Sequence, residues 1–183
     1  MEEIYIDQRH RRILELINPN KKQKILVIGT GFYPKIEHML FYEYWCKNII
    51  SGDIDRKNTE NGKKVLPKLS FIYLDAQKKF PFKNESFDRV ILTEVLEHLP
   101  NEQIALSEII RVLKRKGSLI MTVPRRRIFG VLSPVTLFSH RREYDKERIS
   151  RVLVNSGYFG KRISTGGSYL DLVSLWIHLI YKW

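Results

Sequence analysis

The sequence is poor in cysteine, and its first residues do not resemble an export signal. Cys46 is the one cysteine among 183 residues, so no disulfide can form within the chain. Residues 1–12 mix charges of both signs and lack the apolar core of a signal peptide. The histidines are scattered and show no metal-ligand spacing with Cys46. We therefore expect a protein of the reducing cytoplasm that has no metal centre.

Acidic residues are also scarce relative to basic ones. The chain has 32 Lys and Arg against 20 Asp and Glu, which gives a formal net charge of +12. A basic surface attracts phosphate-bearing partners such as nucleic acid or anionic lipid head groups. The basic residues are spread over five separate groups, 9–12, 21–24, 63–68, 111–116 and 125–127. The charge can therefore indicate either a surface that binds phosphate groups or an ordinary solvated surface, and both interpretations stay open.

Short apolar runs predict the strands, and the first three of them stop at glycine or aspartate. These runs are residues 24–28, 48–52, 69–74, 87–93 and 118–123, with an edge strand at 159–164. Helical spacing is found in residues 13–17, 34–44, 102–113 and 145–155. We expect one α/β domain over residues 1–183, with a Rossmann-like doubly wound, mainly parallel sheet of six or seven strands and helices on both faces.

A glycine turn follows the first predicted strand, but its third glycine is missing. Gly29 and Gly31 allow the backbone to approach a ligand closely, at the edge where parallel sheets bind ligands. The dinucleotide fingerprint requires another glycine at position 34, where this chain has Pro34. The pattern therefore disfavours NAD as the ligand.

Aspartates end the next two predicted strands. Asp53 follows Gly31 by about 20 residues, the interval at which a carboxylate accepts hydrogen bonds from ribose hydroxyls. Asp55 could exchange roles with it, and either residue could instead cap a helix. Asp75 ends the third strand, where it could accept a hydrogen bond from an adenine amine.

Five segments together resemble a known family. They are Ile25–Gly31 (ILVIGTG), Gly52–Asp55 (GDID), Asp75–Ala76, Phe80–Pro100 (FPFKNESFDRVILTEVLEHLP) and Glu108–Pro124. This ordered set resembles the class I S-adenosylmethionine-dependent methyltransferases of the type 11 kind, over roughly residues 22–160. The resemblance implies a methyltransferase with S-adenosyl-L-methionine as its cofactor.

The resemblance also implies roles for eight residues. It places Gly29 and Gly31 beside the methionine part of the cofactor, Asp53 at the ribose, Asp75 and Ala76 at the adenine, and Thr93 and Glu94 at the sulfonium, and it counts Ile54 among the residues that bind the cofactor. Two positions depart from the family pattern. Val27 stands where an acidic residue is usual, and Tyr33 stands where a further glycine is frequent. These departures keep open the alternative of a catalytically silent, cofactor-binding partner subunit.

Residues outside the cofactor motifs are candidates for contact with the acceptor. His98 could act as a general base because its ordinary pKa is near neutrality, or it could simply cap the following turn. Residues 125–144 read as a long loop or lid, in which His140, Arg141, Arg142 and Tyr144 could bind an anionic acceptor or be solvated. Residues 169–183 read as an amphipathic C-terminal helix, which could pack on the sheet or contact a membrane surface peripherally.

The leading functional hypothesis is methyl transfer to a small-molecule, lipid or glycan acceptor. An RNA or protein methyltransferase is the second hypothesis, and the basic charge is its support. The sequence does not indicate the identity of the acceptor or the oligomeric state.

Overall fold

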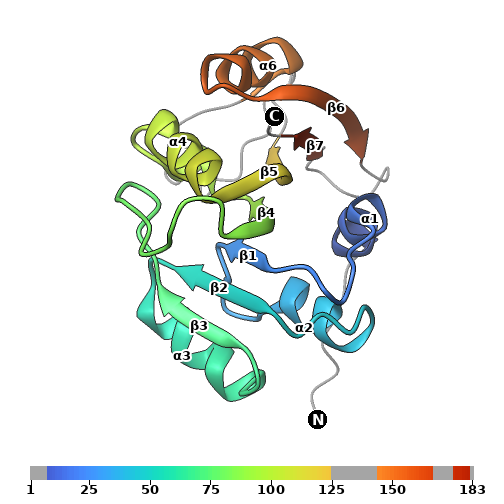
Figure 1. The fold of residues 1–183 in the computed structure, drawn as a ribbon, viewed down its shortest axis with the longest axis vertical. Coiled ribbons are helices and arrows are strands. Elements are labelled where there is room, and N and C mark those ends of the chain that lie inside the picture. The colour runs from blue at the N-terminus through green and yellow to red at the C-terminus, as the bar shows by residue number, and fades with distance from the viewer. Residues whose placement is uncertain (1–7, 125–143, 167–174, 182–183) are drawn as a thin grey trace, which may run out of the picture.

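The computed structural model describes residues 8–124, 144–166 and 175–181 (Figure 1). The helices are α1 (Gln8–Ile17), α2 (Lys35–Tyr42), α3 (Arg56–Val65), the short 3-10 helix η1 (Leu96–His98), α4 (Glu102–Val112) and α6 (Lys146–Asn155). The strands are β1 (Ile25–Ile28), β2 (Ile49–Asp53), β3 (Ser70–Tyr73), β4 (Phe87–Thr93), β5 (Leu113–Pro124), β6 (Phe159–Gly166) and β7 (Leu175–Tyr181).

The strands form one sheet of seven in the order β3-β2-β1-β4-β5-β7-β6. The first five strands in this order run parallel, and β7 runs antiparallel between β5 and β6. All four residues of β1 are buried, as expected for a central parallel strand with helices on both faces. The predicted Rossmann-like sheet is therefore confirmed.

Two hydrophobic cores lie on opposite faces of this sheet. Leu26 and Ile28 of β1 belong to the core that α4 and α6 cover, whereas Ile25 and Val27 belong to the core of α1 and α2. Successive strand residues point to opposite faces, so one short strand contributes to both cores. Figure 1 shows α4 and α6 on one side of the sheet and α1 and α2 on the other.

The last described segment is a strand and not a helix. Residues 175–181, within the predicted helix 169–183, form β7, and the rest of that range lies outside the described residues. Leu175–Tyr181 is rich in aromatic and β-branched residues, which favour strands. β7 is paired with a strand on each side, and a nearly continuous apolar run suits a strand in such a position. The same kind of run is also found in buried helices, so the sequence alone does not distinguish the two. The helix prediction was therefore wrong, and with it the amphipathic helix proposed for membrane contact.

None of the helices in the described ranges is long and apolar enough to cross a membrane.

Tyr144 lies in the core and not in an exposed lid. Its side chain is fully buried against the core of α4 and α6, and its hydroxyl donates a hydrogen bond to Glu102. Tyr144 does not line either of the cavities described below. This burial gives no support to the prediction that Tyr144 contacts an acceptor. His140 and Arg141 lie outside the described residues, as does the rest of the predicted lid.

The loop before β4 is fastened to α4 by hydrogen bonds with two residues that form an ion pair within that helix. Arg111 Nη2 lies 2.6 Å from Glu108 Oε2, and Arg111 also donates to the carbonyl oxygens of Phe80 (3.1 Å) and Phe82 (2.8 Å). Glu108 in turn accepts from the Phe80 N–H at 2.7 Å. The hydrogen bonds from Arg111 lower the pKa of Glu108. This network joins the start of the Phe80–Pro100 motif to α4.

Candidate functional site

A glycine turn connects β1 to α2 at the carboxyl end of the sheet. Gly29 has φ +90° and Gly31 has φ +64°, in the region that residues with a side chain rarely adopt. A Cβ atom on Gly29 would clash with Cγ2 of Val95, whereas a Cβ atom on Gly31 would meet no atom within 4 Å. The turn therefore needs Gly29 for both conformation and space, and Gly31 for conformation alone.

Asp53, the last residue of β2, organises this turn. Its side chain accepts hydrogen bonds from the N–H of Gly31 (3.0 Å), the N–H of Asp55 (2.8 Å) and Nδ2 of Asn58 (3.2 Å). A carboxylate has about four acceptor positions, so one remains for a ligand hydroxyl. Asp55 instead caps α3, where it accepts from the N–H of Lys57 at 2.8 Å. The two aspartates thus have separate roles.

A cavity of about 810 Å³, the larger cavity, opens beside this turn. Its walls come from the carboxyl ends of β1, β2, β3 and β4 and from η1, the edge at which open parallel sheets bind ligands. All eight residues predicted to bind the cofactor line it: Gly29, Gly31, Asp53, Ile54, Asp75, Ala76, Thr93 and Glu94. The structure therefore brings the sequence-predicted set together in one place, and the role of each residue stays a prediction.

Asp75, which follows β3, lies in a turn that forms another wall of the larger cavity. Asp75 Oδ1 accepts from the N–H of Gln77 at 2.9 Å, and Oδ2 lies 3.4 Å from Nζ of Lys78. Leu99 and Pro100, which follow η1, complete this wall with apolar surface. A planar, partly apolar group with a hydrogen-bond donor at its edge fits such a wall.

Glu94 follows β4 directly and has an unusual backbone conformation. Its φ is +53°, an uncommon conformation for a residue with a side chain. Thr122 of β5 holds it there, because Thr122 Oγ1 donates to Glu94 Oε1 (3.0 Å) and the Glu94 N–H donates to the Thr122 carbonyl oxygen (3.2 Å). Backbone strain of this kind often marks functional sites.

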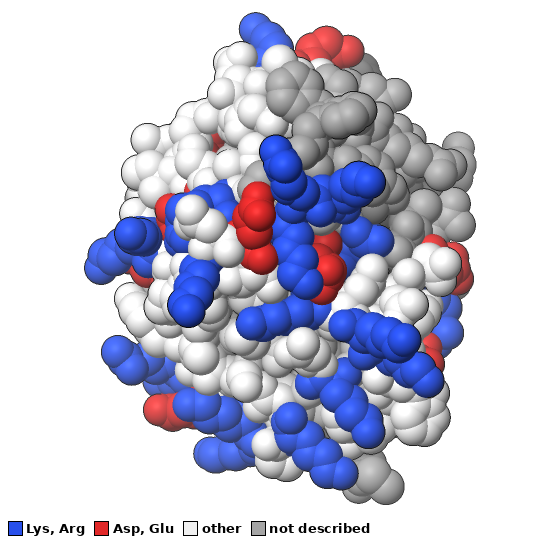
Figure 2. All heavy atoms as spheres, viewed as in Figure 1, with Lys and Arg blue, Asp and Glu red and all other residues white. Residues whose placement is uncertain are grey.

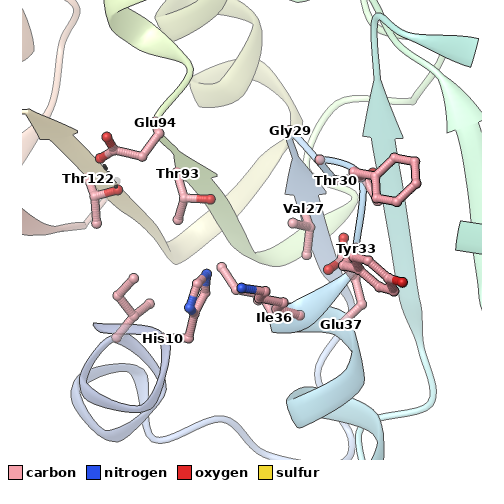
Figure 3. A pocket seen from close by; sticks show the side chains of 14 residues that line it. His10, Val27, Gly29, Thr30, Tyr33, Ile36, Glu37, Thr93, Glu94 and Thr122 are labelled. Atoms are coloured by element: carbon pink, nitrogen blue, oxygen red, sulfur yellow. Dashed lines mark hydrogen bonds between the residues drawn. The ribbon is translucent and has the colours of Figure 1, made fainter. Parts of the chain in front are cut away.

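A second cavity of about 410 Å³, the smaller cavity, lies on the other side of the glycine turn. It shares Gly29, Gly31, Thr93 and Glu94 with the larger cavity. Figure 3 shows its remaining walls, with His10 on α1, Ile36 and Glu37 on α2, and Thr122 on β5. Sequence reasoning missed this cavity, since it forms only where α1 and α2 pack against the same face of the sheet.

Glu37 is a buried carboxyl group in the wall of the smaller cavity. Only 1% of it is exposed, and Ser51 Oγ donates to Glu37 Oε1. Burial raises the pKa of Glu37 to about 7, and the negative charge of Asp53 adds to the increase, whereas the hydrogen bond from Ser51 opposes it. A signal was present in the sequence, because Glu37 is an acidic residue between the apolar positions Ile36, Met39 and Leu40 of α2.

His98 lines the larger cavity but not the smaller one. Its side chain is 43% exposed, and Nε2 lies 3.9 Å from Oε1 of Glu97. Glu97 itself is fully buried, and burial raises its pKa to about 8, with the charge of Glu94 as the second cause. His98 is thus a wall residue beside a carboxyl group that is mostly protonated at neutral pH.

The fold and the two cavities define a class of protein. A doubly wound sheet with a glycine turn after β1 and an aspartate at the end of β2 is typical of Rossmann-like domains that bind an adenosine cofactor. The chain belongs to the methyltransferase domain family, whose model matches residues 26–121, more than half of the chain. The sequence-based recognition of a class I methyltransferase is therefore confirmed.

Individual relatives agree with this assignment. A "probable S-adenosylmethionine-dependent methyltransferase" of Mycobacterium tuberculosis is 25% identical over 115 residues, which cover 62% of this chain and 41% of the relative. The chain therefore spans less than half the length of this relative. Among solved structures, the S-adenosylmethionine complex of Haemonchus contortus phosphoethanolamine N-methyltransferase 2 has a TM-score of 0.77 at 15% identity, over 95% of this chain and 52% of that one. A methyltransferase from Aquifex aeolicus has a TM-score of 0.68 at 14% identity, over 93% and 88%. At these identities the structures show the fold alone.

The glycine turn allows a matched pair of substitutions. Gly29→Ala is expected to weaken the binding of S-adenosylhomocysteine at least tenfold, about 1.4 kcal/mol, because the added methyl group pushes Val95 into the larger cavity. Gly31→Ala meets open space, so only the cost of its positive φ remains, about 1 kcal/mol of stability. Isothermal titration calorimetry on both variants, with circular dichroism to confirm folding, measures the difference. Equal affinity of Gly29→Ala and the wild type would contradict this description of the turn.

Proposed function

We propose that this chain is an S-adenosylmethionine-dependent methyltransferase whose acceptor is a small molecule, lipid or glycan that places its reacting group in the smaller cavity. The observation that carries the proposal is the meeting of the two cavities at Gly29, Gly31, Thr93 and Glu94. Both volumes fall within the range of about 300–1,000 Å³ that is usual for small-molecule sites. A cofactor on one side of this wall and an acceptor on the other would meet at the end of β4.

The residues of the larger cavity fit S-adenosylmethionine chemically. Asp53 would accept a hydrogen bond from a ribose hydroxyl, Ile54 and Leu99 would contact the adenine ring, and the glycine turn leaves room for the methionine chain. When bound, the cofactor supplies a methyl group on a positively charged sulfur. The chain itself supplies orientation, which accounts for much of the rate increase when two reactants must align, several kcal/mol or more.

The positions of the two cavities suggest which residue acts as the general base for the methyl acceptor. His98, the candidate from the sequence, lines the larger cavity, whereas His10 lines the smaller one. An acceptor in the smaller cavity would therefore contact His10 before His98. We propose His10 as the first candidate for a general base and keep His98 as the second. Once an acceptor is known, the pH dependence of kcat in His10→Gln and His98→Gln distinguishes the two residues.

The acceptor class is tested by labelling. The protein is incubated with S-adenosylmethionine carrying a radioactive methyl group and, separately, with small molecules, lipids, glycans, RNA and proteins from a cell extract. Label in a small-molecule, lipid or glycan fraction supports the proposal, and Asp53→Ala serves as the inactive control. Label in RNA or protein supports the alternative acceptors. A protein that binds S-adenosylhomocysteine but labels no fraction supports the silent partner subunit.

The basic charge keeps RNA as the second candidate acceptor. Lys and Arg side chains are spread over much of the face shown in Figure 2, with some acidic side chains between them. Exposed basic residues of and near α3 contribute to the charge, namely Lys57, Lys63, Lys64 and Lys68. An RNA-binding surface predicts an affinity that falls steeply as the salt concentration rises. Absence of RNA binding at low salt would remove this candidate.

A further inference from the structure

A buried chain of hydrogen bonds links three polar side chains, those of Thr30, Ser51 and Glu37. Thr30 Oγ1 lies 2.6 Å from Ser51 Oγ, and Ser51 Oγ donates to Glu37, so Thr30 is the donor to Ser51. All three residues are at most 5% exposed. The chain begins inside the glycine turn and ends on a carboxyl group in the wall of the smaller cavity.

The carboxyl group at the end of this chain has no cationic partner within the described ranges, because none of their ion pairs includes Glu37. Burying a carboxylate without a cation is costly, and a bound cation would offset that cost. The charged and titratable groups around Glu37 and the cavity are His10 on α1, Tyr33 before α2, Lys35 on α2, Asp53 on β2 and Glu94 after β4.

Glu37 also lies where β1 lacks an acidic residue. Val27 is paired in register with Ser51, the residue that donates to Glu37. Figure 3 shows Val27 and Glu37 close together below the glycine turn. The carboxyl group that β1 does not provide at position 27 is therefore brought to this place by α2.

We propose that the Glu37 carboxylate binds the α-ammonium group of the cofactor's methionine part, and that Ser51 and Thr30 hold the carboxylate in position. The proposal rests on the cofactor site of the proposed function. It assigns the glycine-turn end of the smaller cavity to the amino acid part of the cofactor and leaves the His10 end to the acceptor. Ionisation of Glu37 near neutral pH then couples binding to pH, because the pKa of Glu37 is raised to about 7.

Two ligands that differ only in the amino acid part test the proposal. S-adenosylhomocysteine carries the α-ammonium group, whereas 5′-methylthioadenosine keeps the adenosine and the sulfur but lacks the ammonium. Calorimetry on the wild type is expected to show a strong preference for S-adenosylhomocysteine. In Glu37→Gln this preference falls by about tenfold or more, while the affinity for 5′-methylthioadenosine stays within about twofold. Ser51→Ala is expected to show the same pattern more weakly.

The pH dependence provides a second readout. From pH 6 to pH 8 the affinity of the wild type for S-adenosylhomocysteine is expected to rise, because Glu37 ionises over this range and its carboxylate attracts the ammonium. In Glu37→Gln the rise is lost, and with 5′-methylthioadenosine it is absent in both proteins. The inference is overturned if Glu37→Gln weakens both ligands equally or neither of them. Failure of the wild type to bind either ligand would overturn the cofactor site as well.

Discussion

Replacing Asp53 with alanine is expected to weaken the binding of S-adenosylhomocysteine by about 100-fold, or about 2.7 kcal/mol. The variant loses the acceptor for a ribose hydroxyl, and a hydrogen bond to a charged group contributes about 1.5–3 kcal/mol. It also leaves the Gly31 N–H and the Asn58 amide without the carboxylate that they bind at 3.0 and 3.2 Å. The glycine turn is therefore less well ordered for the ligand. Isothermal titration calorimetry measures the loss.

Asp55→Ala is the matched control for this substitution. It removes a carboxylate two residues away that caps α3 and does not line the larger cavity. Loss of the cap costs about 1 kcal/mol of stability, and the ligand affinity should change by less than about threefold. Similar affinity losses in the two variants would mean that Asp53 acts only through folding. Unchanged affinity in Asp53→Ala would remove Asp53 from the site.

Replacing Glu97 with glutamine is expected to stabilise the protein in alkaline solution. The Glu97 carboxyl group is fully buried, and neither of its oxygens has a hydrogen-bond partner among the described residues. Burial raises its pKa from 4.5 to about 8. Between these two values the unfolded chain has released a proton that the folded chain retains, so the free energy of unfolding of the wild type falls as the pH rises.

Glutamine removes this dependence, because it cannot ionise. Relative to the wild type, Glu97→Gln should gain about 3 kcal/mol in the free energy of unfolding between pH 5 and pH 8. Urea denaturation at several pH values measures the gain. Glu108→Gln is the control of opposite sign, since its pKa is lowered by Arg111 and its carboxylate stabilises the fold once ionised. A Glu97→Gln variant that matches the pH profile of the wild type would show that Glu97 is solvated or paired.

The parts of the fold predicted well are those with unambiguous local signals. Residues 87–93 were predicted as a strand and form β4, and the strand predicted at 24–28 is β1 at Ile25–Ile28. Both runs are short and rich in β-branched and other apolar residues, and Gly29 ends the run at 24–28. Gly29, Gly31, Asp53 and Asp75 were predicted from the ends of parallel strands, which share one edge of the sheet, whereas Ile54, Ala76, Thr93 and Glu94 were predicted from the family resemblance.

The parts that were missed depend on packing between distant segments. The smaller cavity needs α1 beside α2, so no local pattern identifies His10 as part of its wall, and the acidic Glu37 between apolar positions of α2 was the one local signal. Residues 175–181 carry an apolar run that suits a helix or a buried strand, and only pairing with β5 and β6 decides between them. The start of β5 was also missed: the structure begins it at Leu113, and the pairing with β4 shifts register before Ser118.

A crystal structure of the wild-type protein with S-adenosylhomocysteine tests the central claim most directly. We predict the adenine beside Ile54, the ribose hydroxyls at Asp53 and the sulfur near the shared wall of Thr93 and Glu94, with the smaller cavity beside His10 left open for an acceptor. A ligand bound elsewhere, or crystals of the folded protein that take up no ligand at saturating concentration, would contradict the account.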